Sequence, residues 1–225
     1  MSNLFVSVYI GQQHFTYRDT NGNLQDCWYG SDGWHLQQIN DAGGAGATVP
    51  GEYIAMPLGT AAAVGGVFAC PYNDQHHFAY LDANGNIQDC WYDGPQDTWK
   101  LQQINRGNGP SVPGEYVATD GPVAVGDLFV SVYIGQQHFT YRDTNGNLQD
   151  CWYGGDGWHL QQINDAGGGG ATVPGEYIAL PGATAPRSDV GELHLTGDSE
   201  LNPAHRWRPG RPSTGDAGTA NVQTR

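Results

Sequence analysis

The chain has 225 residues, is rich in glycine (34) and in aromatic residues (7 Trp, 12 Tyr), and has only 14% charged residues. Many aromatic and turn-forming residues with few Lys or Glu disfavour helices and favour short strands joined by tight turns. The formal net charge of −14 resides in residues 1–182. Because a surface this acidic repels phosphate backbones, we expect no nucleic-acid partner.

Four strands are predicted at the start of the chain, at residues 5–9, 14–18, 24–29 and 34–39. The second and third are separated by a turn that contains Asn21-Gly22. Asn-Gly tolerates a positive φ at both positions and is the strongest short-range hairpin signal. Gly- and Pro-rich sequence follows the fourth strand. This part of the chain therefore predicts four short antiparallel strands.

The same pattern recurs twice more along the chain, at a period of about 60 residues. The sequence Asp-Cys-Trp-Tyr stands at 26–29, 89–92 and 150–153. We assign the repeats to residues 1–66, 67–127 and 128–189. We interpret residues 190–225 as the start of a vestigial fourth repeat followed by a disordered tail, because that segment lacks strand and helix periodicity.

Repeated four-stranded antiparallel units predict an all-β fold of tandem β-propeller blades. A threefold β-prism or a β-trefoil also has three four-stranded units and stays open as an alternative. Three blades are fewer than the ~4–8 that close a ring, so they would leave strand edges and apolar faces in water. We therefore expect an open array or a homo-oligomer that completes the ring, with two chains giving six blades as the simplest closure.

No apolar stretch approaches the ~18 residues that a membrane-spanning helix needs. The start of the chain also lacks the charged and apolar regions of an export signal. We expect a soluble protein without a membrane span, either cytoplasmic or exported by another route.

Several residue patterns were weighed as cofactor or metal sites. The four cysteines are interpreted as reduced thiols, because Cys27, Cys90 and Cys151 occupy one repeated position and would lie far apart. His14, His77 and His138, each preceded by Gln13, His76 or Gln137, would have to converge to bind a metal. Hydrogen-bonded strand histidines are favoured instead. We predict no metal site and no cofactor.

The loop from Asp19 to Asp26 is rich in oxygen atoms that could bind calcium. Its Gly22, however, is the fourth residue from Asp19, whereas the calcium-binding helix–loop–helix pattern requires glycine at the sixth position. A hairpin turn in which Asp and Asn side chains bind backbone amides is the favoured interpretation.

Catalysis finds little support in the sequence. No nucleophile elbow, P-loop, HExxH or dinucleotide fingerprint is present. The repeated carboxylates imply equivalent sites, whereas an enzyme requires one asymmetric pocket. We therefore predict a non-enzymatic protein with no catalytic residues.

A carboxylate among aromatic residues is the strongest functional pattern. Aromatic rings cover the apolar faces of sugars, and carboxylates accept hydrogen bonds from sugar hydroxyls. In an alternating strand Asp26 shares a face with Trp28, which we expect to be structural, so Asp26 is either a buried bridge or a ligand acceptor. The pattern occurs three times, at Asp26, Tyr29 and Trp34, at Asp89, Tyr92 and Trp99, and at Asp150, Tyr153 and Trp158.

The run Tyr17-x4-Gly22-Asn23-Leu24-Gln25-Asp26-Cys27-Trp28-Tyr29-x4-Trp34 resembles the blade motif of fungal and bacterial fucose-binding β-propeller lectins. That motif has a Tyr, a Gly turn, an Ile-x-Glu strand, a Trp-Asp-Gly turn and a further Trp at similar spacing. The resemblance covers roughly half of residues 1–182. It places Asp26, Asp89 and Asp150 at the family's sugar-binding Glu. The two aromatic positions of each repeat then match the two Trp positions of the motif.

One position departs from that motif. The family's sugar-binding Arg precedes the Tyr by two residues, where this chain has Phe15, Phe78 and Phe139. The resemblance therefore implies blade architecture and glycan binding rather than fucose specificity. The predicted function is a lectin-like, carbohydrate-binding module with repeated sites. A structural or protein-interaction propeller scaffold is the alternative.

Overall fold

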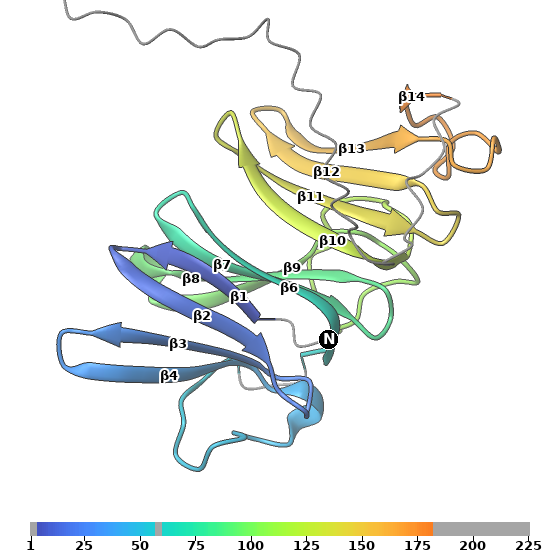
Figure 1. Ribbon diagram of the computed structural model, residues 1–225. Helices are drawn as coiled ribbons and strands as arrows, with labels where there is room; N and C mark the ends of the chain where they lie inside the picture. Colours follow the sequence, from blue (N-terminus) through green and yellow to red (C-terminus); the bar gives the residue numbers. More distant parts are fainter. Residues whose placement is uncertain (1–3, 57–59, 182–225) are drawn as a thin grey trace, which may run out of the picture. The chain divides into compact units, whose positions relative to one another are not determined.

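Three separate sheets follow one another along the chain, and each is formed by one repeat (Figure 1). The computed structural model describes residues 4–56 and 60–181, which belong to one compact unit. We call the sheets blade 1, blade 2 and blade 3. Blade 1 contains β1 (Leu4–Tyr9), β2 (Gln12–Arg18), β3 (Leu24–Gly30), β4 (Gly33–Asn40) and β5 (Ile54–Met56). Blade 2 contains β6 (Ala63–Tyr72), β7 (Gln75–Asp82), β8 (Ile87–Asp93) and β9 (Thr98–Gln103). Blade 3 contains β10 (Ala124–Tyr133), β11 (Gln136–Asp143), β12 (Leu148–Gly154), β13 (Gly157–Asn164) and β14 (Ile178–Leu180).

The predicted all-β fold with four antiparallel strands per repeat is confirmed. The short strands β5 and β14 were not predicted, and they run parallel to β4 and β13. The first strands of blades 2 and 3, β6 and β10, begin at Ala63 and Ala124, slightly before the repeat limits taken from the sequence. The predicted fourth-repeat start and tail at 190–225 lie outside the described residues. Within the described part, no helix has the length and apolar character needed to cross a membrane.

Each blade has two chemically different faces, because side chains alternate along its strands. We define the His face of blade 1 by His14, Thr16, Asp26 and Trp28, which are paired across β2 and β3. The opposite side, here called the aromatic face, contains Phe15, Cys27, Tyr29, Trp34 and Leu36. Blades 2 and 3 repeat this arrangement in the same register.

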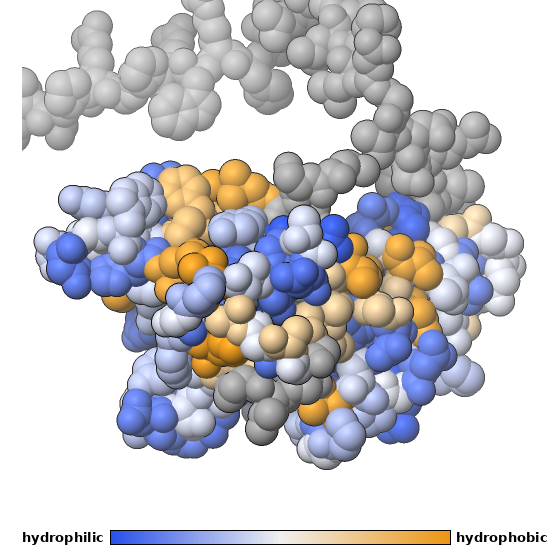
Figure 2. Space-filling view, turned by 90° about the horizontal axis from the view of Figure 1, so that it is seen from below, coloured by the Kyte–Doolittle hydropathy of each residue, from blue (hydrophilic) through white to orange (hydrophobic). Residues whose placement is uncertain are grey.

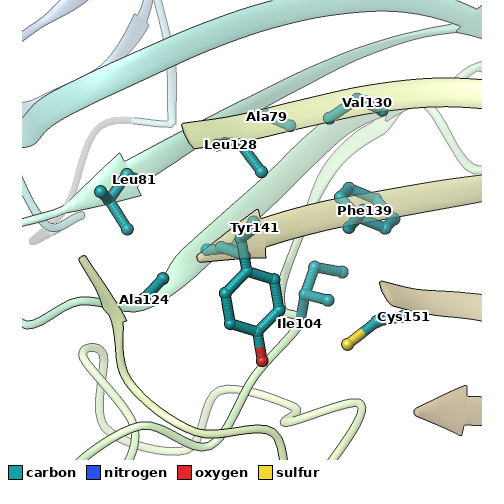
Figure 3. Packing of buried hydrophobic residues seen from close by; sticks show 10 residues of the cluster. Ala79, Leu81, Ile104, Ala124, Leu128, Val130, Phe139, Tyr141 and Cys151 are labelled. Atoms are coloured by element: carbon teal, nitrogen blue, oxygen red, sulfur yellow. The ribbon is translucent and has the colours of Figure 1, made fainter. Parts of the chain in front are cut away.

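The His face of each blade packs on the aromatic face of the next. Blade 2 is therefore covered on both sides, by blade 1 through one hydrophobic cluster and by blade 3 through another. Figure 3 shows the second cluster, to which Ala79 and Leu81 of blade 2 and Phe139 and Tyr141 of blade 3 belong. The two clusters fall on opposite faces of blade 2, since Phe78 belongs to one and its neighbour Ala79 to the other.

The first strands of the blades lie side by side, with β6 between β1 and β10 (Figure 1). Phe5 contacts Phe68, with ring centroids 5.3 Å apart, and Phe68 contacts Phe129 at 5.7 Å. Sheets that are each built from one repeat, stacked face to face along their first strands, are propeller blades. A β-trefoil would mix strands of different repeats, and a β-prism would leave one face of each sheet in water.

The predicted turn after the second strand is stabilised by its own side chains. The Asp19 carboxylate accepts hydrogen bonds from the backbone amides of Asn21 and Asn23, at 2.8 and 2.9 Å. Of the Asn-Gly pair only Gly22 has a positive φ, of 85°. A Cβ atom there would also lie 3.0 Å from Cβ of Ala62, which leads into blade 2. The turn therefore requires glycine both for its conformation and for the close approach of the next blade.

The aspartate of this turn also anchors the long loop that closes each blade. In blade 2, Asp82 is buried and accepts hydrogen bonds from the amides of Asn84 and Asn86, from Gln88 and from Ser111. Asp19 and Asp143 make the corresponding contacts with Thr48 and Thr172. The same polar network thus occurs in all three blades.

We expect Asp82→Ala to lower the free energy of unfolding by about 3 kcal/mol, because it leaves several buried donors without an acceptor. Asp120→Ala is the control. It removes an exposed ion pair with Arg106, with side chains 65% and 74% exposed, and is expected to cost less than about 1 kcal/mol. Urea denaturation measures both. Equal losses would contradict the structural role assigned to Asp82.

Candidate functional site

The structure corrects the grouping of residues made from the sequence. Within blade 1, Asp26 lies on the His face, whereas Tyr29 and Trp34 are paired on the aromatic face. The same separation holds for Asp89 in blade 2 and Asp150 in blade 3. A carboxylate and its own repeat's two aromatic residues therefore cannot form one site, because the sheet lies between them.

These residue types do meet between neighbouring blades. A cavity of about 410 Å³ is lined by His14, Asp26 and Trp28 of blade 1 and by Tyr92 and Trp99 of blade 2. The site thus combines the His face of one blade with the aromatic face of the next.

The cleft continues beyond this cavity. A further opening of about 610 Å³ shares Tyr53, Tyr92 and Trp99 with the cavity and extends to Met56. The cleft between blades 1 and 2 is therefore longer than the cavity that contains Asp26.

The repeated carboxylate is hydrogen-bonded in each blade, and it is buried in blades 1 and 2 and half-buried in blade 3. Asp26 accepts a hydrogen bond from His14 Nδ1 at 2.8 Å and another from Thr16 Oγ1 at 2.9 Å. Asp150 accepts equivalent bonds from His138 and Thr140. In blade 2, Asp89 pairs with His77 and Gln102, because alanine replaces the threonine. The carboxylate therefore bridges side chains, which is the first of the two roles that the sequence left open.

Histidine is a site residue that the sequence analysis did not select. His14 stacks on Trp28 with ring centroids 5.3 Å apart, and Trp28 stacks on His35 at 5.0 Å. Blade 3 repeats the stack, and in blade 2 Lys100 stands in place of the outer histidine. The Nε2 atoms of His14, His77 and His138 are buried and have no hydrogen-bond partner. Each therefore offers a free polar atom at the base of the His face.

A second cavity, of about 220 Å³, lies between blades 2 and 3 at the equivalent place. It is lined by His77 and Trp91 of blade 2 and by Tyr153 and Trp158 of blade 3. Asn73 stands in its lining where the first cavity has Ile10. Two further positions also differ, of which Cys70 lies beside the cavity and not in its lining. Cys70 stands where blade 1 has Ser7, and Gln137 stands where blade 2 has His76.

Burial changes the chemistry of both differing positions. It lowers the pKa of His76 to about 4, so this imidazole is neutral at neutral pH. It also raises the pKa of the Cys70 thiol to about 12. A nucleophilic cysteine must be a thiolate, and a thiol with this pKa stays protonated although His77 and Asp89 are close in the fold.

The outer faces of blades 1 and 3 have no neighbouring blade among the described residues. Trp34, on the aromatic face of blade 1, is 68% exposed. On the His face of blade 3, the His138 and Asp150 side chains are each 15% exposed, against 7% and 2% for His14 and Asp26. Blade 3 thus has the carboxylate half of a site, and blade 1 has the aromatic half.

Comparison with known proteins finds no matching family model and no matching curated protein. Similar solved structures include AofleA from Arthrobotrys oligospora, at 12% identity and a TM-score of 0.44, covering 72% of this chain and 41% of that one. The Aleuria aurantia lectin follows at 14% identity and 0.41, with coverage of 71% and 43%. A fucose lectin from Kordia zhangzhouensis has 14% identity and a TM-score of 0.37, with coverage of 70% and 96%. The chain thus spans less than half the length of the first two lectins, and all three similarities are distant.

We expect Asp26→Ala to lower the free energy of unfolding by about 3 kcal/mol, because it leaves His14 Nδ1 and Thr16 Oγ1 buried without an acceptor. The same change at Asp150 is expected to cost at least about 1 kcal/mol less, because the more exposed partners can bind water. Thermal or urea unfolding of the two variants measures the loss of stability in each. An equal loss would show that the neighbouring blade does not determine the burial of this carboxylate.

Proposed function

We propose that the protein is a non-catalytic carbohydrate-binding module whose sites lie between adjacent blades and recur along the chain. The observation that carries this proposal is the cavity between blades 1 and 2, which has an aromatic wall on one side and polar groups on the other. Sugars present apolar C–H faces that pack on aromatic rings and hydroxyls that need directed hydrogen-bond partners. An open cleft with these two walls meets both requirements.

The Asp26 carboxylate holds the His14 ring in place on the polar side of the proposed site. Both Asp26 oxygens already accept hydrogen bonds from blade 1, so the free Nε2 of His14 and the partly exposed Gln37 are the groups offered to a sugar hydroxyl. Trp99 and Tyr92 form the opposite wall. Trp99 is partly buried in the hydrophobic cluster, which fixes its orientation.

The length of the cleft favours an oligosaccharide over a single sugar, because the opening beyond Trp99 continues the same aromatic wall. Some of the similar lectins are described in complex with fucosides. This chain has Phe15, Phe78 and Phe139 where the lectin motif has an arginine. We therefore propose glycans as the ligand class and leave the terminal sugar to experiment.

Two observations favour binding over catalysis. The two cavities repeat the same histidine and tryptophan, and one aspartate binds that histidine in each case. Hydrolysis of a glycosidic bond instead requires two carboxyl groups with different roles. The thiol beside the second cavity is protonated at neutral pH. Repeated weak sites instead raise avidity without new contacts.

A glycan array with the 225-residue chain tests the proposal. We expect binding that Trp99→Ala weakens at least about tenfold, because stacking on this ring is lost. Tyr177→Ala is the control, since this exposed residue lines neither cavity between the blades. Gln37→Ala provides a second variant, outside the hydrophobic cluster.

No binding to any glycan, or equal binding by the Trp99→Ala, Gln37→Ala and Tyr177→Ala chains, would overturn the proposed site. The first outcome favours the scaffold alternative, in which the buried carboxylates serve only the fold. Near-ultraviolet circular dichroism confirms that each variant is folded before binding is compared.

We further propose that chains associate head to tail through their outer blades. Repeats 1 and 3 have nearly the same sequence, so a difference in the exposure of matching residues shows the effect of a neighbouring blade. Leu4 and Val6 are 57% and 45% exposed on blade 1, whereas the matching Leu128 and Val130 of blade 3 are 5% and 6% exposed against blade 2. Viewed from the side on which β3 and β4 lie in Figure 1, hydrophobic residues occur at several places among hydrophilic ones (Figure 2).

A second copy would supply the cover that both outer faces lack among residues 4–56 and 60–181. The His face of its blade 3 would pack on the aromatic face of blade 1. This contact would resemble the one within the chain, where the His face of blade 1 packs on the aromatic face of blade 2. This contact would also complete a third site, with Asp150 and His138 from one chain and Trp34 from the other. Two such contacts close a ring of six blades, within the range of known propellers.

Analytical ultracentrifugation measures the association directly. The unchanged chain is expected to sediment as a dimer at micromolar concentration, and Leu36→Glu as a monomer, because the variant places a charge on the outer aromatic face. Tyr116→Glu, at an exposed loop residue, is expected to remain dimeric. A monomeric unchanged chain across this range would contradict the association.

A further inference from the structure

Two histidines and an aspartate from different blades meet at the base of the first cavity. His14 and Asp26 belong to blade 1 and His76 to blade 2, and all three side chains are buried. One ligand atom from each lies within 4.8 Å of the others. The two imidazole rings are 4.6 Å apart between centroids and nearly perpendicular, at 74°. The cluster therefore exists only where two blades pack together.

The hydrogen bonds leave one imidazole nitrogen free. A carboxylate only accepts hydrogen bonds, so His14 Nδ1 carries the proton in its 2.8 Å contact with Asp26. His14 Nε2 then keeps its lone pair, and it is buried without a hydrogen-bond partner. On the other blade, His76 Nε2 lies 3.0 Å from Ser7 Oγ. The other ring nitrogen of His76, Nδ1, takes no part in this hydrogen bond.

We propose that His14 and His76 bind a divalent transition-metal ion of the zinc type, with Asp26 orienting His14. Metal-binding histidines commonly donate their other ring N–H to a carboxylate, which fixes the tautomer and raises the basicity of the ligand. Imidazole nitrogens are preferred ligands of zinc, nickel and copper. The remaining coordination positions face the cavity and are open to water or to another ligand there. The metal site does not depend on the glycan proposal. Because a bound ion takes the lone pair of His14 Nε2, a sugar in the same cavity would then rely on Gln37 and on the open coordination positions.

The local charge favours a cation. An imidazole must be neutral to bind a metal, so the cluster that receives the ion has the single negative charge of the Asp26 carboxylate, and the chain as a whole carries −14. A zinc–nitrogen bond measures about 2.0–2.1 Å, so two ligands of one ion are at most about 4.2 Å apart. One ring nitrogen of His14 and one of His76 lie within 4.8 Å of each other. A small movement of the two side chains can therefore bring both imidazoles to one ion.

The other interface provides an internal comparison. Between blades 2 and 3, His77 and Asp89 repeat the first half of the cluster, and His77 Nε2 is also without a partner. Gln137, however, stands where His76 stands, and it donates a hydrogen bond to Cys70 Sγ at 3.4 Å. A single residue thus separates an interface with two facing imidazoles from one with a single imidazole.

Zinc titration of the chelator-treated 225-residue chain tests the proposal, with calorimetry for stoichiometry and NMR for the histidine ring nitrogens. We expect one equivalent to bind and to shift the ring-nitrogen resonances of His14 and His76. His76→Gln is expected to weaken this binding at least about tenfold, and Asp26→Asn about 10- to 100-fold, as for other residues that orient a ligand. His159→Gln, at the matching half-buried histidine of blade 3 that pairs with Asp156, is expected to bind zinc like the unchanged chain.

Equal zinc affinity of the unchanged and His76→Gln chains, or no zinc binding by either, overturns the proposal. His76→Gln should fold, because Gln is already present at the matching positions 13 and 137. If it does not fold, Gln137→His decides. This variant creates a second facing pair with His77 and is expected to bind a second equivalent, whereas an unchanged stoichiometry contradicts the proposed site.

Discussion

The structure depends on the packing of unlike sheet faces. Each blade has a polar, histidine-bearing face and an aromatic face, and neither can be covered by a copy of itself without leaving polar atoms unpaired or rings in water. Stacking in one direction solves this problem, because the His face always meets the aromatic face of the next blade. Blade 2 shows the completed arrangement, with a hydrophobic cluster on each side.

The same constraint produces the candidate sites. The His face is held rigid by buried aspartates that fix their histidines, and the aromatic face brings a tryptophan and a tyrosine to the opposite wall. A site therefore belongs to a pair of blades and not to one repeat. Nearly identical repeats can still form different sites, because each cavity takes its walls from two repeats. The substitutions at His76 and Cys70 change one wall each and leave the fold as it is.

Much of this arrangement follows from the sequence. Alternation and the Asn-Gly turns located the four strands of each repeat, and Asp19 binds the turn amides as expected. Alternation also placed Asp26 and Trp28 on one face. The partner face could not be predicted, because periodicity within a strand does not say which blade lies opposite. For that reason the sequence analysis grouped Asp26 with Trp34 instead of Trp99, and did not bring His14 together with His76. The parallel strands β5 and β14 follow irregular loops and have no alternating pattern of their own.

NMR of the tryptophan indole groups during titration with the best glycan of the array tests the central claim most directly. If the site lies between blades, the signals of Trp28 and Trp99, which are 71 positions apart in the sequence, shift together with one dissociation constant. A response confined to residues of a single repeat, such as Trp28 with no change at Trp99, would contradict the account.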